Sequence, residues 1–190
     1  MKQIVLVACG DYRDLDQYLQ LKDSKRILLV CDPSISFLGI NDYFLTLEER
    51  LGVKVVRFSD FQPNPLYESV VKGVDLFLAE ACDTIVAVGG GSAMDVAKCI
   101  KLYSNMDRSE NYLKQSIVPN DTPFIAVPTT AGTGSEATRY AVIYYEGEKQ
   151  SIADYSCIPS VVLFDTSVLE TLPLYQKTAT LMDAMCHSIE

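Results

Sequence analysis

Short apolar runs alternate with segments of helical periodicity along most of this chain, and this alternation limits the folds that it can adopt. The runs are continuously apolar, as is typical of strands that are buried on both faces of a parallel sheet. The expected strands are Ile4–Ala8, Arg26–Cys31, Val53–Phe58, Thr84–Val88, Phe124–Val127 and Val161–Phe164. The expected helices between them span residues 14–21, 41–51, 66–82 and 92–103. The sequence therefore predicts an α/β fold in which helices cover both faces of a parallel sheet.

Residues 41–51 carry signals for both ends of a helix. Asn41 or Asp42 can cap its first turn, and Gly52 follows its last residue, where helices favour glycine. We therefore expect one continuous helix between these signals.

The pattern changes after Pro128. Apolar segments at 140–145 and 149–152 flank Glu146-Gly147, which predicts a β-hairpin. The pattern is again helical from Leu172-Pro173 to Glu190, with no glycine to end it. We expect residues 1–166 to form one domain. Residues 167–190 would begin a second, all-helical domain whose remainder is absent from this sequence.

Composition and charge exclude several classes of function. Lys and Arg total 16 against 25 Asp and Glu, a formal net charge of −9, so no nucleic-acid partner is expected. No apolar run approaches the roughly 18 residues of a membrane span. The single histidine, His187, excludes a His-rich metal centre or a Ser-His-Asp site elsewhere in the chain. The six cysteines lack a CxxC spacing, and we expect small buried thiols in a reducing cytoplasm.

A glycine-rich loop joins the expected strand 84–88 to the helix 92–103. Gly89, Gly90 and Gly91 let main-chain N–H groups approach a ligand closely, and the helix that follows presents unpaired N–H groups to an anion. Phosphate or pyrophosphate is the expected ligand, although neither the GxGxxG fingerprint nor a Walker loop is present. The alternative is a tight strand-to-helix turn that binds nothing.

Two further segments follow expected strands. Asp32 ends the second strand, where an acid can hold ribose hydroxyls and repel a 2′-phosphate, although acids also serve there as plain turn residues. Pro128–Glu136 is rich in hydroxyl and glycine residues and can wrap a polar ligand, or it can be an ordinary surface loop.

Asp183 and His187 lie four residues apart in the last helix, so both project from one face. A carboxylate and an imidazole at this spacing can share Fe²⁺, Zn²⁺ or Mn²⁺. Two ligands are too few for a metal site, and a hydrogen-bonded Asp–His pair is the alternative.

Three of these segments carry a family resemblance that covers essentially the whole chain. Gly89–Lys98 matches the pattern GGGSxxDxxK, and Pro128–Thr138 matches PTTAGTGSEVT with Ala137 in place of Val. Met182–Glu190 is similar to DALxHxxE, with Met185 in place of Leu. In this order the motifs resemble the iron-containing (group III) alcohol dehydrogenase family. The segments around 139–143 and 149–152 look most like its phosphonoacetaldehyde reductase branch.

The resemblance implies a dinucleotide-binding domain like that of dehydroquinate synthase, followed by an all-helical domain. NAD is the implied cofactor, with NADP as the alternative. The implied cofactor-binding residues are Asp32, Gly89, Gly90, Gly91, Ser92, Asp95, Thr129, Thr130, Thr133, Thr138 and Lys149. Asp183 and His187 fall on two of four metal ligands, with Fe²⁺ expected and Zn²⁺ as the alternative.

The implied activity is hydride transfer between nicotinamide and a small alcohol or aldehyde, with phosphonoacetaldehyde as one candidate. No catalytic residue beyond the metal ligands is identifiable, and the family's other two histidine ligands lie beyond this sequence. We therefore expect an inactive fragment that binds nucleotide, and a homodimer for the full-length protein. The alternatives are an enzyme like glycerol-1-phosphate dehydrogenase or dehydroquinate synthase, and a non-catalytic nucleotide-binding half-protein.

Overall fold

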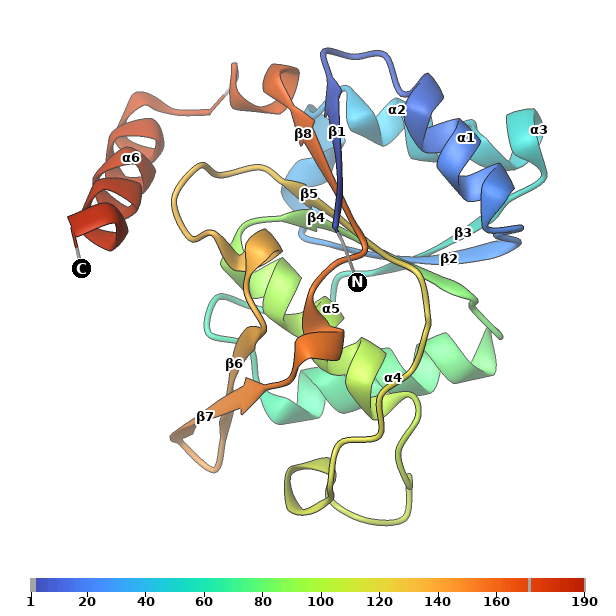
Figure 1. The fold of residues 1–190 in the computed structure, drawn as a ribbon, viewed down its shortest axis with the longest axis vertical. Helices are drawn as coiled ribbons and strands as arrows, with labels where there is room; N and C mark the ends of the chain where they lie inside the picture. The colour runs from blue at the N-terminus through green and yellow to red at the C-terminus, as the bar shows by residue number, and fades with distance from the viewer. Residues whose placement is uncertain (1–2, 171, 190) are drawn as a thin grey trace.

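A computed structural model of the protein describes residues 3–170 and 172–189. Within these residues a six-stranded sheet pairs in the order β1-β8-β5-β4-β2-β3 (Figure 1), and every pairing in it is parallel. Its strands are β1 (Ile4–Ala8), β2 (Arg26–Cys31), β3 (Lys54–Phe58), β4 (Thr84–Gly89), β5 (Phe124–Pro128) and β8 (Val161–Asp165). Each expected strand is found within one residue of its predicted ends, so the predicted parallel sheet is confirmed.

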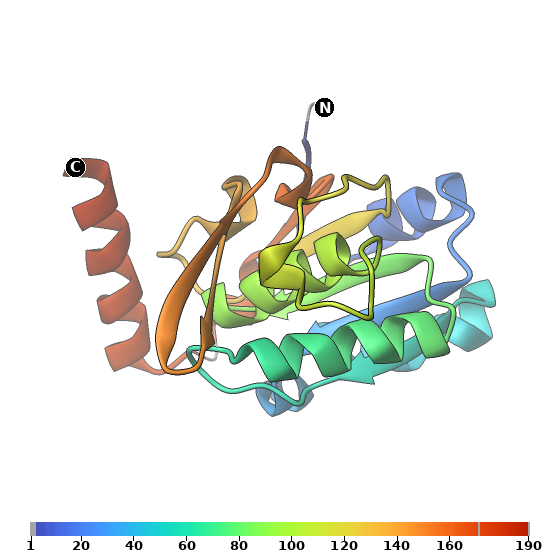
Figure 2. The ribbon, with the colours of Figure 1, turned by 90° about the horizontal axis from the view of Figure 1, so that it is seen from below.

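Helices cover both faces of this sheet (Figures 1 and 2). One face carries α1 (Arg13–Leu21), α2 (Ile40–Leu45) and α3 (Leu47–Leu51), and the other carries α4 (Tyr67–Ala79) and α5 (Gly91–Tyr103). Successive side chains of a strand point to opposite faces, so Leu28 joins the core under α4 and α5 while Leu29 joins the core under α1 to α3. The central strands β4 and β5 are therefore buried on both faces, whereas Val5 and Val7 of the edge strand β1 stay exposed.

The predicted single helix over 41–51 is wrong in two details. The first helix begins at Ile40 after Gly39, without a side-chain cap from Asn41 or Asp42. The helix is then interrupted at Thr46, whose hydroxyl donates to the Asp42 carbonyl oxygen at 3.0 Å. A β-branched residue that bonds back to its own helix weakens it there, and a second short helix follows. The predicted end at Gly52 is confirmed, because Gly52 takes the left-handed conformation with φ +70°.

The predicted hairpin is also confirmed. Its strands β6 (Tyr140–Tyr145) and β7 (Glu148–Ala153) pair antiparallel, and Glu146 and Gly147 both have positive φ in the turn. The inward face of β6 packs on α5 through Ala141 and Ile143. Short 3-10 helices join the other elements: η1 (Pro33–Phe37), η2 (Tyr112–Lys114), η3 (Ser135–Ala137), η4 (Tyr155–Cys157) and η5 (Thr166–Leu169).

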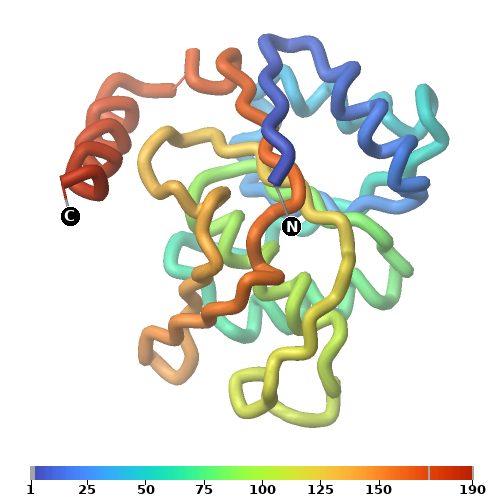
Figure 3. Tube along the Cα trace, in the orientation of Figure 1, coloured from blue at the N-terminus to red at the C-terminus, as the bar shows by residue number. Residues whose placement is uncertain are grey.

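The last helix, α6 (Leu174–Ile189), stands away from the body of the molecule (Figures 1 and 3). None of its residues is buried, and Leu174, Tyr175 and Ile189 are each about four-fifths exposed. The helix predicted from the sequence is thus confirmed as far as Ile189, and Glu190 lies outside the described residues. The boundary predicted at 166 falls in η5, and the division into two domains stays a prediction.

The cysteines divide into two groups. Cys31, Cys82, Cys99 and Cys157 are buried free thiols, as predicted, whereas Cys9 and Cys186 are exposed. Cys186 is exposed because it belongs to α6, which is buried nowhere along its length. No described helix combines the length and the apolar character that a membrane crossing requires.

Candidate functional site

The carboxyl ends of β2, β4 and β5 lie side by side at one edge of the sheet. Cys31 is in register with Val88, and Gly89 with Pro128. The segments that follow these strands therefore start together, and they begin with Asp32, Gly90 and Thr129. Ligands of open α/β sheets bind at this edge.

A groove of about 490 Å³ runs between these segments, and we call it the glycine-loop groove. It is lined by Asp32, Phe61, Gln62, Pro63, Gly90, Gly91, Ser92, Ala93, Thr130, Thr133, Gln176 and Thr180. Six of the residues predicted from the sequence to bind cofactor, namely Asp32, Gly90, Gly91, Ser92, Thr130 and Thr133, are thus brought together. Phe61, Gln62, Pro63, Ala93, Gln176 and Thr180 were not predicted.

The glycines let three segments approach one another at this groove. A Cβ on Gly89 would lie 2.7 Å from the Cβ of Ala93, which is too close for the turn from β4 into α5. A Cβ on Gly90 would lie 3.3 Å from Thr130 Oγ1, and one on Gly91 would lie 3.3 Å from Thr133 Cγ2. No side chain caps the start of α5, so its first N–H groups can serve a bound anion.

Asp32 has two roles at the groove. Its Oδ1 accepts a hydrogen bond from the main-chain N–H of Ser34 at 2.8 Å and caps η1. Asp32 therefore does serve as a turn residue, which was one of the two predicted roles. Its Oδ2 would lie 3.6 Å from a Cβ on Gly89, so the second oxygen reaches the glycine loop. The carboxylate can therefore hold the turn and still accept hydrogen bonds from a ligand.

Asp95 and Lys98 belong to a buried network behind the groove. Ser135 Oγ donates to Asp95 Oδ1 at 3.0 Å, and Lys98 Nζ donates to Ser135 Oγ at 3.1 Å. Lys98 Nζ also donates to the Tyr140 carbonyl oxygen at 2.6 Å, and the Val142 N–H donates to Asp95 Oδ2 at 3.1 Å. Burial raises the pKa of Asp95 and lowers the pKa of Lys98. The network ties α5 to η3 and β6, and the predicted contact of Asp95 with a pyrophosphate stays a prediction.

Four other predicted residues, Gly89, Thr129, Thr138 and Lys149, do not line the groove. Gly89 ends β4, and its carbonyl oxygen accepts the Thr129 N–H at 3.0 Å. Thr138 Oγ1 accepts from Lys98 Nζ at 3.3 Å. Lys149 is an exposed residue of β7, opposite Tyr144. Their proposed contacts with a cofactor stay predictions.

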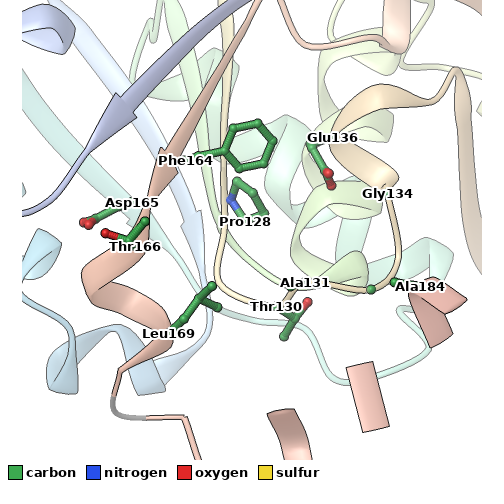
Figure 4. A pocket seen from close by; sticks show the side chains of 11 residues that line it. Pro128, Thr130, Ala131, Gly134, Glu136, Phe164, Asp165, Thr166, Leu169 and Ala184 are labelled. Atoms are coloured by element: carbon green, nitrogen blue, oxygen red, sulfur yellow. The ribbon is translucent and has the colours of Figure 1, made fainter. Parts of the chain in front are cut away.

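An apolar cleft of about 430 Å³ adjoins the groove at Thr130 (Figure 4). It is lined by Pro128, Thr130, Ala131, Gly132, Gly134, Glu136, Phe164, Asp165, Thr166, Leu169 and Ala184. The Phe164 ring lies beside Pro128, and Ala184 contributes α6 to the opposite wall. Cleft and groove together make a continuous surface along the sheet edge.

Asp183 and His187 form the predicted pair on α6. Asp183 Oδ1 lies 3.5 Å from His187 Nε2, and both side chains are about half exposed. A carboxylate and an imidazole are a suitable donor set for a divalent transition metal. Among the described residues, no third His, Cys, Asp or Glu completes a metal-binding group, so the pair supplies part of a site.

The groove residues that were not predicted come from two places. Phe61 to Pro63 belong to the segment that follows β3, the neighbour of β2, so the strand order would have indicated them. Gln176 and Thr180 belong to α6, whose approach to the loop after β5 is not encoded in any local pattern. Gly132 makes this approach possible, because a Cβ there would lie 2.6 Å from the Thr180 carbonyl oxygen.

Comparison with known proteins gives one consistent result. The family described as "Iron-containing alcohol dehydrogenase" matches residues 3–166. An aldehyde-alcohol dehydrogenase of Streptococcus pneumoniae is 36% identical over 196 residues, covering 94% of this chain and 22% of that protein. An NAD-dependent methanol dehydrogenase of Bacillus methanolicus is 33% identical, covering 97% of this chain and 50% of that protein.

Solved structures agree with the sequence comparisons. The crystal structure of a 1,3-propanediol oxidoreductase superposes with a TM-score of 0.89 at 32% identity. The match covers 98% of this chain and 50% of that one. The chain therefore spans half or less of the length of these relatives.

Proposed function

Because this chain belongs to the iron-containing alcohol dehydrogenase family, we propose that it binds a nicotinamide dinucleotide in the glycine-loop groove. The whole protein would transfer hydride between that cofactor and a small alcohol or aldehyde. The main support for the proposal is that Asp32, the glycine loop and the uncapped start of α5 lie together at the carboxyl edge of the sheet.

The chemistry of the groove supports NAD in particular. The N–H groups at the start of α5 would bind the pyrophosphate, because the helix end carries a partial positive charge. Asp32 Oδ2 would accept from ribose hydroxyls, and its charge would repel the 2′-phosphate of NADP. The relative from Bacillus methanolicus is described as NAD-dependent. NADP is the alternative cofactor.

The adjoining apolar cleft would receive the nicotinamide and the substrate. Its apolar wall residues Pro128, Phe164 and Leu169 would favour the displacement of water by these groups. Among its described residues none is a cation, whereas Glu136 and Asp165 are acids. A neutral substrate therefore fits this part of the cleft, and the phosphonoacetaldehyde assignment rests on the sequence resemblance alone.

Asp183 and His187 would supply two ligands to a divalent metal, with Fe²⁺ as the first candidate and Zn²⁺ as the second. When bound, the metal would supply a Lewis acid for the substrate oxygen, and the nicotinamide cofactor would accept or donate the hydride. The remaining ligands would come from residues outside those described. We accordingly propose that this chain binds nucleotide without turning over, and that the full-length protein is a cytoplasmic homodimer. A non-catalytic nucleotide-binding protein is the second candidate.

Fluorescence titration of the chain with NADH tests the proposed function. Wild type should bind NADH saturably and more tightly than NADPH. Gly90→Val should weaken NADH binding by about a hundredfold or more, because its side chain would fill the approach to the α5 N–H groups.

Gly39→Val is the matched control, since a Cβ there meets no atom within 4 Å. It should bind NADH like wild type. Equal NADH affinity for Gly90→Val and wild type would remove the glycine loop from the site, and no binding by wild type would refute the proposal.

A further inference from the structure

The glycine-loop groove contains few groups that can offset the charge of a pyrophosphate. Among the described residues that line it there is no Lys, Arg or His, and Asp32 is the one charged side chain. Side-chain nitrogen donors come, within the same set, from the carboxamides of Gln62 and Gln176. A dinucleotide carries two negative charges on its pyrophosphate, so a donor next to the start of α5 would add to the helix N–H groups.

The two glutamines belong to different parts of the groove. Gln62 follows β3, which pairs with β2, the strand that ends before Asp32. This is the side on which a ribose is expected. Gln176 comes from α6, one turn before Thr180, which approaches the loop containing Gly132. The same loop carries Thr130 and Thr133 against Gly90 and Gly91, so Gln176 stands on the pyrophosphate side.

Gln176 has a donor available, whereas its neighbour Thr180 does not. The Thr180 hydroxyl donates within α6, to the carbonyl oxygens of Gln176 at 3.0 Å and Lys177 at 3.2 Å. The Gln176 carboxamide makes no hydrogen bond to any of the described residues. Its N–H₂ group can therefore turn to a ligand without breaking a contact of the fold.

We propose that Gln176 is a cofactor-positioning residue, whose carboxamide donates a hydrogen bond to the pyrophosphate held at the start of α5. This inference rests on the proposed function and adds to it a contact between the cofactor and α6. The cofactor then bridges α5 and α6, and it holds the Asp183–His187 pair in place over the sheet edge. Since α6 buries none of its own residues, this bridge adds to contacts such as the hydrogen bond from Lys177 Nζ to the Glu170 carbonyl oxygen.

A charge series at position 176 tests the proposal, with affinities measured by calorimetry on the full chain. NADH affinity should rise in the order Gln176→Glu, wild type, Gln176→Lys, with a step of about fivefold to tenfold each way, because the substituted charge acts on the pyrophosphate. The steps should shrink in 1 M salt, where the Debye length falls to about 3 Å. Adenosine, which has no phosphate, should bind all three proteins equally.

Gln20→Glu and Gln20→Lys provide the matched control, because Gln20 is an exposed residue of α1 away from the groove. They make the same changes in net charge and should leave NADH affinity unchanged. Equal NADH affinity across the 176 series would overturn the role of Gln176 while the proposed function stands. The role of Gln176 would also be overturned if the affinity for adenosine changed across the 176 series by the same factors as the affinity for NADH. Failure of wild type to bind NADH would overturn the proposed function and this inference together.

Discussion

The helices α5 and α6 both reach the candidate site, yet they are held in the molecule in opposite ways. Ten of the 13 residues of α5 are buried, including Lys98 and Lys101, whereas none of α6 is. The glycine loop is therefore fixed by the core of the domain before any ligand arrives. The Asp183–His187 pair sits on a helix whose position depends on few contacts. We infer that the dinucleotide part of the site is preorganised and that the metal part needs further partners.

The largest expected difference between α5 and α6 is in the free energy of unfolding lost when a leucine on each helix is replaced by alanine. Leu102→Ala should lower the free energy of unfolding by about 3 kcal/mol, because Leu102 is completely buried and its loss leaves a cavity. Leu181→Ala on α6 should change it by less than about 0.5 kcal/mol, because Leu181 is 61% exposed. Urea denaturation measures both. A large loss for Leu181→Ala would show that α6 is packed against something in solution.

A smaller difference in unfolding free energy is expected when Lys98 of α5 and Lys177 of α6 are each replaced by methionine. Lys98→Met should cost about 2 kcal/mol of unfolding free energy, because the Tyr140 carbonyl oxygen and Ser135 lose a buried donor. Lys177→Met removes one exposed bond to the Glu170 carbonyl oxygen and should cost close to nothing. Equal effects on the denaturation midpoint would contradict the assignment of Lys98 to a buried network.

The smallest expected effect is on alkaline stability. Burial raises the pKa of Cys157 to about 11, from an ordinary value of 9.0. Stability linked to this thiol is complete below pH 9 and is lost as pH rises toward 11, because the unfolded chain releases the proton first. Wild type should therefore lose about 1 kcal/mol more than Cys157→Ala between pH 9 and pH 10. Parallel pH profiles for the two proteins would show that this thiol is not buried in solution.

The sequence predicts the part of the molecule in which local patterns and packing agree. Apolar runs located all the strands of the described sheet, because the inner strands of a parallel sheet are buried on both faces, and even the edge strand β3 keeps an apolar pair beside its exposed Lys54 and Arg57. Gly52 and Gly147 located a helix end and a turn, because glycine adopts a positive φ without the steric cost of a side chain. The break at Thr46 was missed, because it depends on one side-chain bond to the Asp42 carbonyl oxygen.

Residues that depend on tertiary contacts were harder to predict. Gln176 lines the groove only because Gly132 lets α6 approach the loop after β5, and no periodicity records that contact. Asp95 lies in a motif that resembles a cofactor loop, yet its carboxylate oxygens bond to Ser135 and Val142. A motif thus locates a segment, while the direction of each side chain is decided by what packs around it.

Amide NMR shifts of the labelled chain, recorded during a titration with NADH, map the NADH-binding site most directly. We predict that the shifts centre on Gly90 to Ala93, Thr130, Thr133 and Gln176, at the carboxyl edge of the sheet. Lys101 and Asn120, at the far end of α5, should not move. Shifts centred on Lys101 and Asn120, or no shifts at the glycine loop at saturating NADH, would contradict binding of the dinucleotide in the glycine-loop groove.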